Sequence, residues 1–119
     1  MAEASCIEAM VPTVDLCAYR SDSFEHHFSY FDEDGIAVDM SGWTARMQIR
    51  KSIGSTTIQL SISESDYITL GVGTIDILVP GASMGIDGGV YDLELTDTLG
   101  LISTLVRGEF AVTPDTSRD

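Results

Sequence analysis

The chain has 119 residues and carries six Lys and Arg against nineteen Asp and Glu, which gives a formal net charge of −13 at pH 7. A negative field of this size repels phosphate backbones, so nucleic acid is not expected as a partner. Hydrophobic residues make up 44% and charged residues 21% of the chain, which is typical of one globular domain with its own core and excludes a disordered chain.

The first twenty residues lack the basic and apolar regions of a signal peptide, and no run of about eighteen apolar residues is present. We therefore expect neither secretion nor a membrane partner. Cys6 and Cys17 have no C-x-x-C spacing and no following histidine pair, so a zinc site is not predicted. A disulfide between them is the alternative and would close only a short N-terminal loop, whereas two reduced thiols are favoured and suit a protein that is assembled in the cytoplasm.

Apolar and polar residues alternate with a period of two along most of the chain, which predicts β-strands. The expected strands are 14–18, 24–30, 36–40, 42–50, 58–62, 67–70, 74–79, 90–96 and 101–112. They follow at intervals of about ten residues without a long amphipathic helix, which is typical of a β-sandwich or barrel. We expect a domain over residues 12–113, an N-terminal arm over 1–11 and a polar tail over 114–119.

The strand over residues 42–50 is expected at the centre of this domain. One of its faces is apolar and holds Trp43, Ala45, Met47 and Ile49. Trp43 is the only tryptophan and offers the core its largest apolar side chain. The opposite face carries Arg46 and Arg50, and Lys51 follows directly. These three basic residues form a candidate docking face on a very acidic molecule.

Residues 87–93 have the spacing D-x-G-x-Y-x-Φ, which immunoglobulin-like (Ig-like) domains use at the corner where a tyrosine hydroxyl bonds to upstream backbone. Leu93 then stands where antibody domains have their second cysteine, and Trp43 packs beside it. Phe28 or His26 takes the place of the first cysteine. The predicted core residues are Trp43, Met47, Ile49, Tyr91, Leu93 and Phe28.

The predicted fold is therefore all-β, a single Ig-like β-sandwich of about seven to nine antiparallel strands, with another sandwich or barrel as the alternative. Strands 42–50 and 90–96 are neighbours in the Ig-like topology. Arg46 and Arg50 are therefore expected to face Asp92 and Glu94 across the exposed side of the sheet.

No catalytic, cofactor or metal site is predicted. Residues 81–85 match G-x-S-x-G, but this motif needs a strand-to-helix turn and a later histidine, whereas His26 and His27 precede it. Adjacent histidines on a strand point to opposite faces, so they do not share a metal. Residues 32–35 lack the spacing of a calcium loop and are expected to be an acidic hairpin tip. The chain is not expected to be an enzyme.

Three segments carry a resemblance to a known group of proteins: residues 43–50, 89–95 and 105–114. Their succession resembles the small Ig-like β-sandwich proteins of tailed bacteriophages. It is similar to the N-terminal module of baseplate upper proteins and to related tail, neck and fibre-anchoring proteins. One departure is that Val90 and Tyr91 replace the more usual double aromatic. The resemblance covers residues 14–117.

The resemblance implies a virion structural protein, assembled in the host cytoplasm, that docks one component of the tail, baseplate or neck onto another. It implies other phage structural proteins and further copies of the chain as partners. Exposed strand edges are also suited to pairing with a partner strand. The alternative is a free Ig-like binding module with a carbohydrate or protein ligand, for which an exposed aromatic platform would be the sign.

Overall fold

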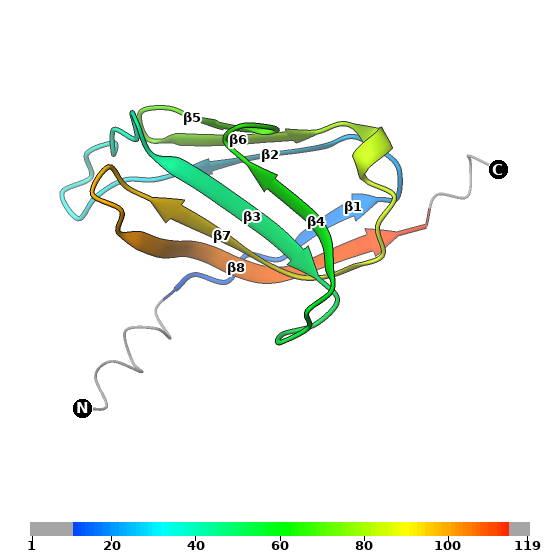
Figure 1. Ribbon diagram of the computed structural model, residues 1–119. Helices are drawn as coiled ribbons and strands as arrows, with labels where there is room; N and C mark the ends of the chain where they lie inside the picture. Colours follow the sequence, from blue (N-terminus) through cyan, green and yellow to red (C-terminus); the bar gives the residue numbers. More distant parts are fainter. Residues whose placement is uncertain (1–10, 115–119) are drawn as a thin grey trace.

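The computed structural model describes residues 11–114, so nearly all of the predicted N-terminal arm and C-terminal tail lies outside the described residues. Eight strands form two sheets, one in the order β1-β8-β7-β3-β4 and the other in the order β2-β6-β5 (Figure 1). The strands are β1 (Leu16–Tyr19), β2 (Phe24–Ser29), β3 (Thr44–Arg50), β4 (Ile58–Ser63), β5 (Ile68–Leu70), β6 (Thr74–Val79), β7 (Gly88–Thr96) and β8 (Ile102–Thr113). The predicted all-β sandwich is confirmed.

A short 3₁₀ helix, η1 (Gly81–Ser83), connects β6 to β7. It occupies the G-x-S-x-G stretch, which is a tight turn between strands of two different sheets. None of the helical structure within residues 11–114 has the length and apolarity needed to cross a membrane.

One edge of the larger sheet departs from a purely antiparallel sandwich. β1 runs parallel to β8, with Leu16 opposite Phe110, whereas the other paired strands are antiparallel. Parallel neighbours need a long connection, and here most of the chain separates the two strands. The expectation of antiparallel strands throughout is therefore wrong for β1.

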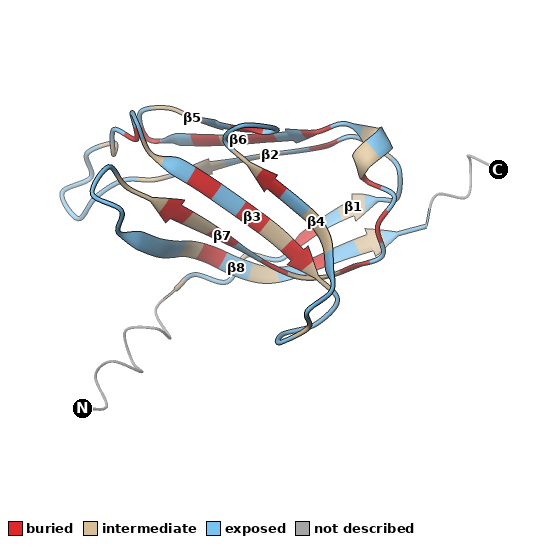
Figure 2. Cartoon of the chain, viewed as in Figure 1, coloured by how far each residue is buried: buried red, intermediate tan, exposed pale blue. Residues whose placement is uncertain are grey.

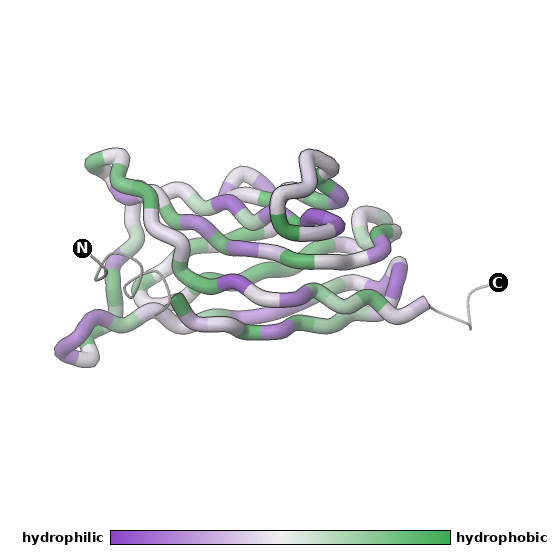
Figure 3. The backbone as a smooth tube through the Cα atoms, turned by 90° about the horizontal axis from the view of Figure 1, so that it is seen from below, coloured by the Kyte–Doolittle hydropathy of each residue, from purple (hydrophilic) through white to green (hydrophobic). Residues whose placement is uncertain are grey.

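The core lies between the two sheets, where alternate residues of each strand are buried (Figure 2). The same alternation is visible as hydrophobic and hydrophilic positions along the strands in Figure 3. Met47 and Ile49 of β3 are buried, and Met47 lies directly opposite Leu93 of β7. Ile75 and Ile77 of β6 face them from the other sheet and are fully buried. Burying each of these side chains stabilises the folded state by about 1.5–3 kcal/mol relative to leaving it exposed.

Trp43 does not lie at the centre of this core. β3 begins at Thr44, so Trp43 precedes the paired strand and lies at one end of the sandwich. Its ring is half-buried and meets the edge of the Tyr30 ring at a centroid distance of 6.5 Å. The register of β3 and β7 gives the place beside Leu93 to Met47 instead. The expected packing of Trp43 on Leu93 is therefore wrong.

Phe28 is half-buried and belongs to a row of rings on the inner face of β2. The imidazole of His26 meets Phe28 edge-on at 4.5 Å and stacks on Phe24 at 6.3 Å. Burial lowers the pKa of His26, and the neighbouring charge of His27 adds to the effect. His26 is consequently an uncharged packing residue near neutral pH.

Residues 36–40, which were expected to form a strand, make only isolated bridges. The Asp32 carboxylate accepts hydrogen bonds from the backbone N–H groups of Asp34 (2.9 Å) and Ile36 (3.0 Å). Such side-chain bonds compete with strand pairing and favour a turn. The acidic tip is thus a turn that is held by its own carboxylate.

In the expected strand 58–62, alternation with a period of two predicts that Ile58, Leu60 and Ile62 share one face, and this is wrong at Ile58. Leu60 and Ile62 lie opposite buried residues of β3, but the register shifts and Ile58 lies opposite Arg50. The unpaired residue in this β-bulge is Gln59, and one extra residue moves the neighbouring side chain to the other face. Ile58 is therefore 43% exposed on the outer face.

The hydroxyl of Tyr91 reaches upstream backbone, as the D-x-G-x-Y spacing predicts, but its partner is far away in the sequence. It donates a hydrogen bond to the carbonyl oxygen of Val14. Gly108 allows this approach, because a Cβ at that position would lie 2.3 Å from the same oxygen. Burial raises the pKa of Tyr91 to about 12, and the charge of Asp15 adds to the shift, so the phenol remains a donor.

The core assignment predicts unequal effects for two identical substitutions. Leu93→Ala should lower the free energy of unfolding by about 2–5 kcal/mol, because it leaves a cavity between the sheets. Leu99→Ala removes the same atoms from a side chain that is 83% exposed and should change the value by at most about 0.5 kcal/mol. Urea denaturation measures both, and equal effects would contradict the assignment.

Candidate docking face

The outer face of the five-stranded sheet carries a shallow groove with a volume of about 810 Å³. Outward-facing residues of β3, β7 and β8 form its floor. The turn between β3 and β4, which projects from the sheet in Figure 1, forms one wall with residues 52–54. Thr13 and Asp15, just before β1, line it on the β8 side.

The groove gathers basic residues of a very acidic chain. Three of the six Lys and Arg line it, namely Arg46, Arg50 and Arg107. Only four of the nineteen acidic residues do so: Asp15, Asp92, Glu94 and Glu109. The lining therefore has a formal charge of −1, against −13 for the chain. A partner meets far less repulsion here than over the rest of the surface.

The two arginines expected to pair across β3 and β7 behave differently. Arg46 lies opposite Glu94, and its Nη2 is 2.8 Å from the Glu94 carboxylate. This is a surface pair worth about 0–1 kcal/mol. Arg50 lies opposite an apolar residue and donates to the carbonyl of Ser55 (2.7 Å) and to Oε1 of Gln48 (3.0 Å). The expected ion pairing is therefore present for Arg46 and absent for Arg50.

Asp92 lies near the middle of the groove, opposite Arg107 in the pairing of β7 with β8. Burial and the charge of Glu94 raise the pKa of Asp92, while Arg46 and Arg50 act against that shift. Its carboxylate is thus partly desolvated and has a like charge beside it. A cationic group of a partner would be attracted to this position.

Sequence reasoning missed Arg107 as a docking residue. Its exposed guanidinium has no hydrogen-bond or ion-pair partner within residues 11–114. A signal was present, because Arg107 follows the apolar Val106 in the predicted strand 101–112 and so falls on its polar face, but the pairing of this strand with β7 comes from the structure. Lys51, which was included in the candidate face, is exposed but does not line the groove.

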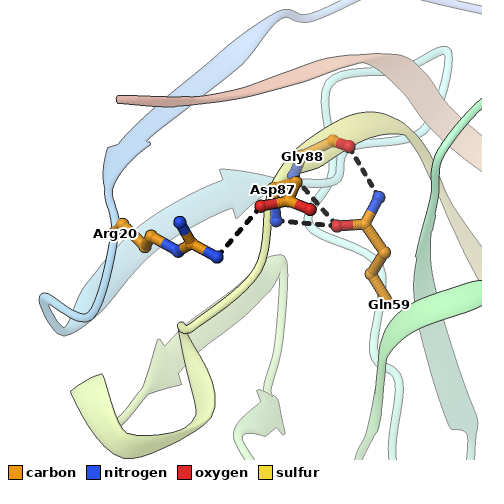
Figure 4. Close-up of polar contacts among 4 residues, drawn as sticks. All are labelled: Arg20, Gln59, Asp87 and Gly88. Atoms are coloured by element: carbon orange, nitrogen blue, oxygen red, sulfur yellow. Dashed lines mark hydrogen bonds and ion pairs between the residues drawn. The ribbon is translucent and has the colours of Figure 1, made fainter. Parts of the chain in front are cut away.

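Gln59 of β4 fixes the place where β7 begins (Figure 4). Its Oε1 accepts hydrogen bonds from the N–H groups of Asp87 (2.8 Å) and Gly88 (3.0 Å), and its Nε2 donates to the Gly88 carbonyl (2.6 Å). Arg20 makes an exposed ion pair with Asp87 at 3.1 Å. One amide side chain thus satisfies three backbone groups beside the end of the groove.

The first two residues of β7 also lie very close to neighbouring backbone. A Cβ at Gly89 would lie 2.1 Å from the carbonyl oxygen of Arg50, and one at Gly88 would lie 2.4 Å from that of Phe110. No side chain fits in either place. The sequence Gly88-Gly89 therefore lets the start of β7 approach β3 and β8 closely.

The contacts of Gln59 can be tested by changing one atom. Gln59→Glu keeps the acceptor but replaces the Nε2 donor with an oxygen that faces the Gly88 carbonyl. We expect the free energy of unfolding to fall by about 1–3 kcal/mol, because a part-buried carbonyl loses its donor. Gln48→Glu is the control: its acceptor still faces Arg50, but it adds a like charge opposite Asp92, so it should lower the value by less than about 1 kcal/mol. Equal effects in urea denaturation would show that the Gln59 contacts are unimportant.

A second polar cluster lies on the outer face of the three-stranded sheet. Nδ1 of His27 is 2.6 Å from the Asp76 carboxylate, and Nε2 is 3.0 Å from that of Glu25. These two hydrogen bonds, that with Asp76 foremost, raise the pKa of His27. The carboxylates contact different ring nitrogens and do not converge on one point. Within residues 11–114, no group of His, Cys, Asp and Glu is arranged to hold a metal ion.

The pKa values of the two histidines should be shifted in opposite directions from the ordinary value for histidine. In a ¹H NMR titration, His27 should titrate above about 6.5 and His26 below it. Because the folded state raises the pKa of His27, its contribution to stability is complete below about pH 6.5 and is lost as the pH rises through the folded value. Asp76→Asn should lower the pKa of His27 and leave that of His26 in place. A His27 that titrates below His26 would contradict the cluster.

Comparisons with known proteins bear on the fold. No family model and no curated protein matches the chain. A structure from work on multimeric cell-adhesive interactions of VGSC beta subunits matches with a TM-score of 0.50 at 13% identity, over 85% of this chain and 92% of that one. Tim-1 matches with a TM-score of 0.43 at 15% identity, over 89% and 97%. The Ig-like domain of human leucine-rich repeat-containing protein 4 matches with a TM-score of 0.44 at 18% identity, over 92% and 88%.

At these identities the matches concern the fold alone, because unrelated functions share such folds. Nothing in them links the chain to phage proteins. The match to the structure from the VGSC beta subunit work, at a TM-score of 0.50, is a similarity of fold only. The chain has an Ig-like β-sandwich fold.

Proposed function

We propose that this chain is a non-catalytic docking module of a tailed-phage particle that binds other structural proteins through the groove on its five-stranded sheet. The observation that carries the proposal is the gathering of Arg46, Arg50 and Arg107 in a nearly neutral groove on a molecule of charge −13. Its place of action would be the virion, after assembly in the host cytoplasm.

The sequence resemblance supports the same face. The segments that resemble phage proteins are residues 43–50, 89–95 and 105–114, and they fall on β3, β7 and β8. These three strands form the floor of the groove. The part of the chain that carries the resemblance is therefore also the part that would touch the partner.

The lining of the groove indicates the chemistry of the partner. The free guanidinium of Arg107 suits a carboxylate, whereas Asp92 and Glu109 suit basic side chains. A protein surface with charges of both signs meets these demands. Tyr91, the one aromatic residue in the lining, is buried and offers no ring for a sugar to stack on. The groove therefore favours a protein ligand over a carbohydrate.

The test is incorporation of the chain into purified phage particles, measured by quantitative mass spectrometry against a major structural protein. The wild-type chain should be present in a fixed ratio. Arg107→Ser should lower incorporation about tenfold, which corresponds to about 1.4 kcal/mol of lost contact. Arg20→Ser removes the same charge from an exposed ion pair outside the groove and should leave incorporation unchanged.

Two results would contradict the proposal in different ways. A chain that is present in infected cells but never in particles would end the assignment to phage structure. Equal incorporation of both variants would show that the groove is not the docking face. Urea denaturation of both variants checks that neither has lost its fold.

A further inference from the structure

The longest stretch of the sequence without Asp, Glu, Lys or Arg is residues 52–63. It contains the turn after β3 and the whole of β4, which is the last strand at one edge of the five-stranded sheet (Figure 1). Two large apolar side chains on it are exposed, Ile53 at 90% and Ile58 at 43%. An uncharged stretch of this kind is unusual on a molecule of charge −13.

β4 is the least protected edge strand within residues 11–114. Natural sheets protect their edges with short strands, charged side chains or proline. β1 has four residues and β5 has three, while β2 has Glu25 and His27 on its outer face. β4 has six residues, none of them charged and none a proline. Its bulge at Gln59 affects only the start of the strand.

The two ends of this uncharged stretch carry opposite charges. Arg50 and Lys51 precede it, and Glu64 and Asp66 follow it. If two β4 strands lie antiparallel with Ser61 opposite Ser61, Glu64 of each copy lies opposite Ile58 of the other, and Ile58 is itself paired with Arg50 of β3. Glu64 and the other copy's Arg50 are then separated by one strand, and Lys51, which follows Arg50, has no ion-pair partner within residues 11–114. The edge is thus complementary in charge to a second copy of itself.

We infer that two copies of this chain pair through β4, antiparallel and centred on Ser61, so that one sheet continues across both copies. When Ser61 lies opposite Ser61 of the second copy, the outer faces of the two five-stranded sheets lie on the same side of the joined sheet. The two docking grooves then lie side by side. The pairing goes beyond the proposed docking role and does not need it, because it forms in the free protein.

Repulsion between two copies of charge −13 opposes this pairing. The uncharged stretch is the part of the surface where they approach with least repulsion. Salt at about 0.15 M limits the range of the remaining repulsion to about 8 Å. The free part of the edge is short, because Ser63 is already bonded to Asp66 in the next turn. The dimer is therefore expected to depend on concentration.

The experiment is sedimentation velocity of the full chain over a range of concentrations at about 0.15 M salt. The wild type should shift from monomer to dimer as the concentration rises. Ser61→Lys changes an exposed residue and places two like charges together at the axis, so the dissociation constant should rise at least about tenfold. Thr69→Lys is the matched control, because it adds the same charge to an exposed position of the other sheet's edge strand β5. It should dimerise like the wild type.

Cross-linking gives a second measurement that does not depend on charge. In a background of Cys6→Ser and Cys17→Ser, Ser61→Cys should form a disulfide-linked dimer on mild oxidation. Residues opposite each other in antiparallel strands have Cα atoms about 4.5–5.5 Å apart, which suits a disulfide. Thr69→Cys should remain monomeric.

Three results would overturn the pairing. The first is a wild type that stays monomeric at every concentration. The second is a dimer that Ser61→Lys and Thr69→Lys affect equally, which would place the interface elsewhere. The third is a monomeric wild type whose incorporation into particles is blocked by Ser61→Lys, which would mean that β4 receives a strand from another protein.

Discussion

The backbones of β7 and its neighbours lie closer together than a side chain would permit. A Cβ at Gly89 would collide with the carbonyl of Arg50, one at Gly88 with that of Phe110, and one at Gly108 with that of Val14. These three positions join β3, β7, β8 and the segment before β1 into a single sheet. The groove exists because that sheet is continuous, since its floor is made from all three of the central strands.

Polar side chains add hydrogen bonds to the backbone segments that the glycines allow to lie close together. Gln59 reaches from the edge strand to satisfy the backbone of Asp87 and Gly88, and the Tyr91 hydroxyl ties Val14 to the centre of the sheet. Both act on segments that have few strand partners of their own. They do so without placing a charge in the core, and the described residues contain no buried charged side chain.

The distribution of charge separates two surfaces that could serve an assembly. The groove mixes three arginines with four carboxylates, which suits a partner with charges of both signs. The β4 edge is uncharged and has opposite charges at its two ends, which suits a second copy. One surface would connect the chain to a different protein and the other to itself.

The period of two in the sequence determined the all-β fold, the strands other than residues 36–40, and, except at Ile58, the side of each strand that faces the core, because burial of one face requires that alternation. It also placed Arg46 and Arg50 on the outer face. Only the tertiary structure decided the register between strands, which puts Met47 rather than Trp43 beside Leu93 and aligns Arg46, but not Arg50, with a carboxylate. The bulge at Gln59, the parallel pairing of β1 and the approach of Arg107 to Asp92 depend on contacts between segments far apart in the chain. Local alternation contains no information about such contacts.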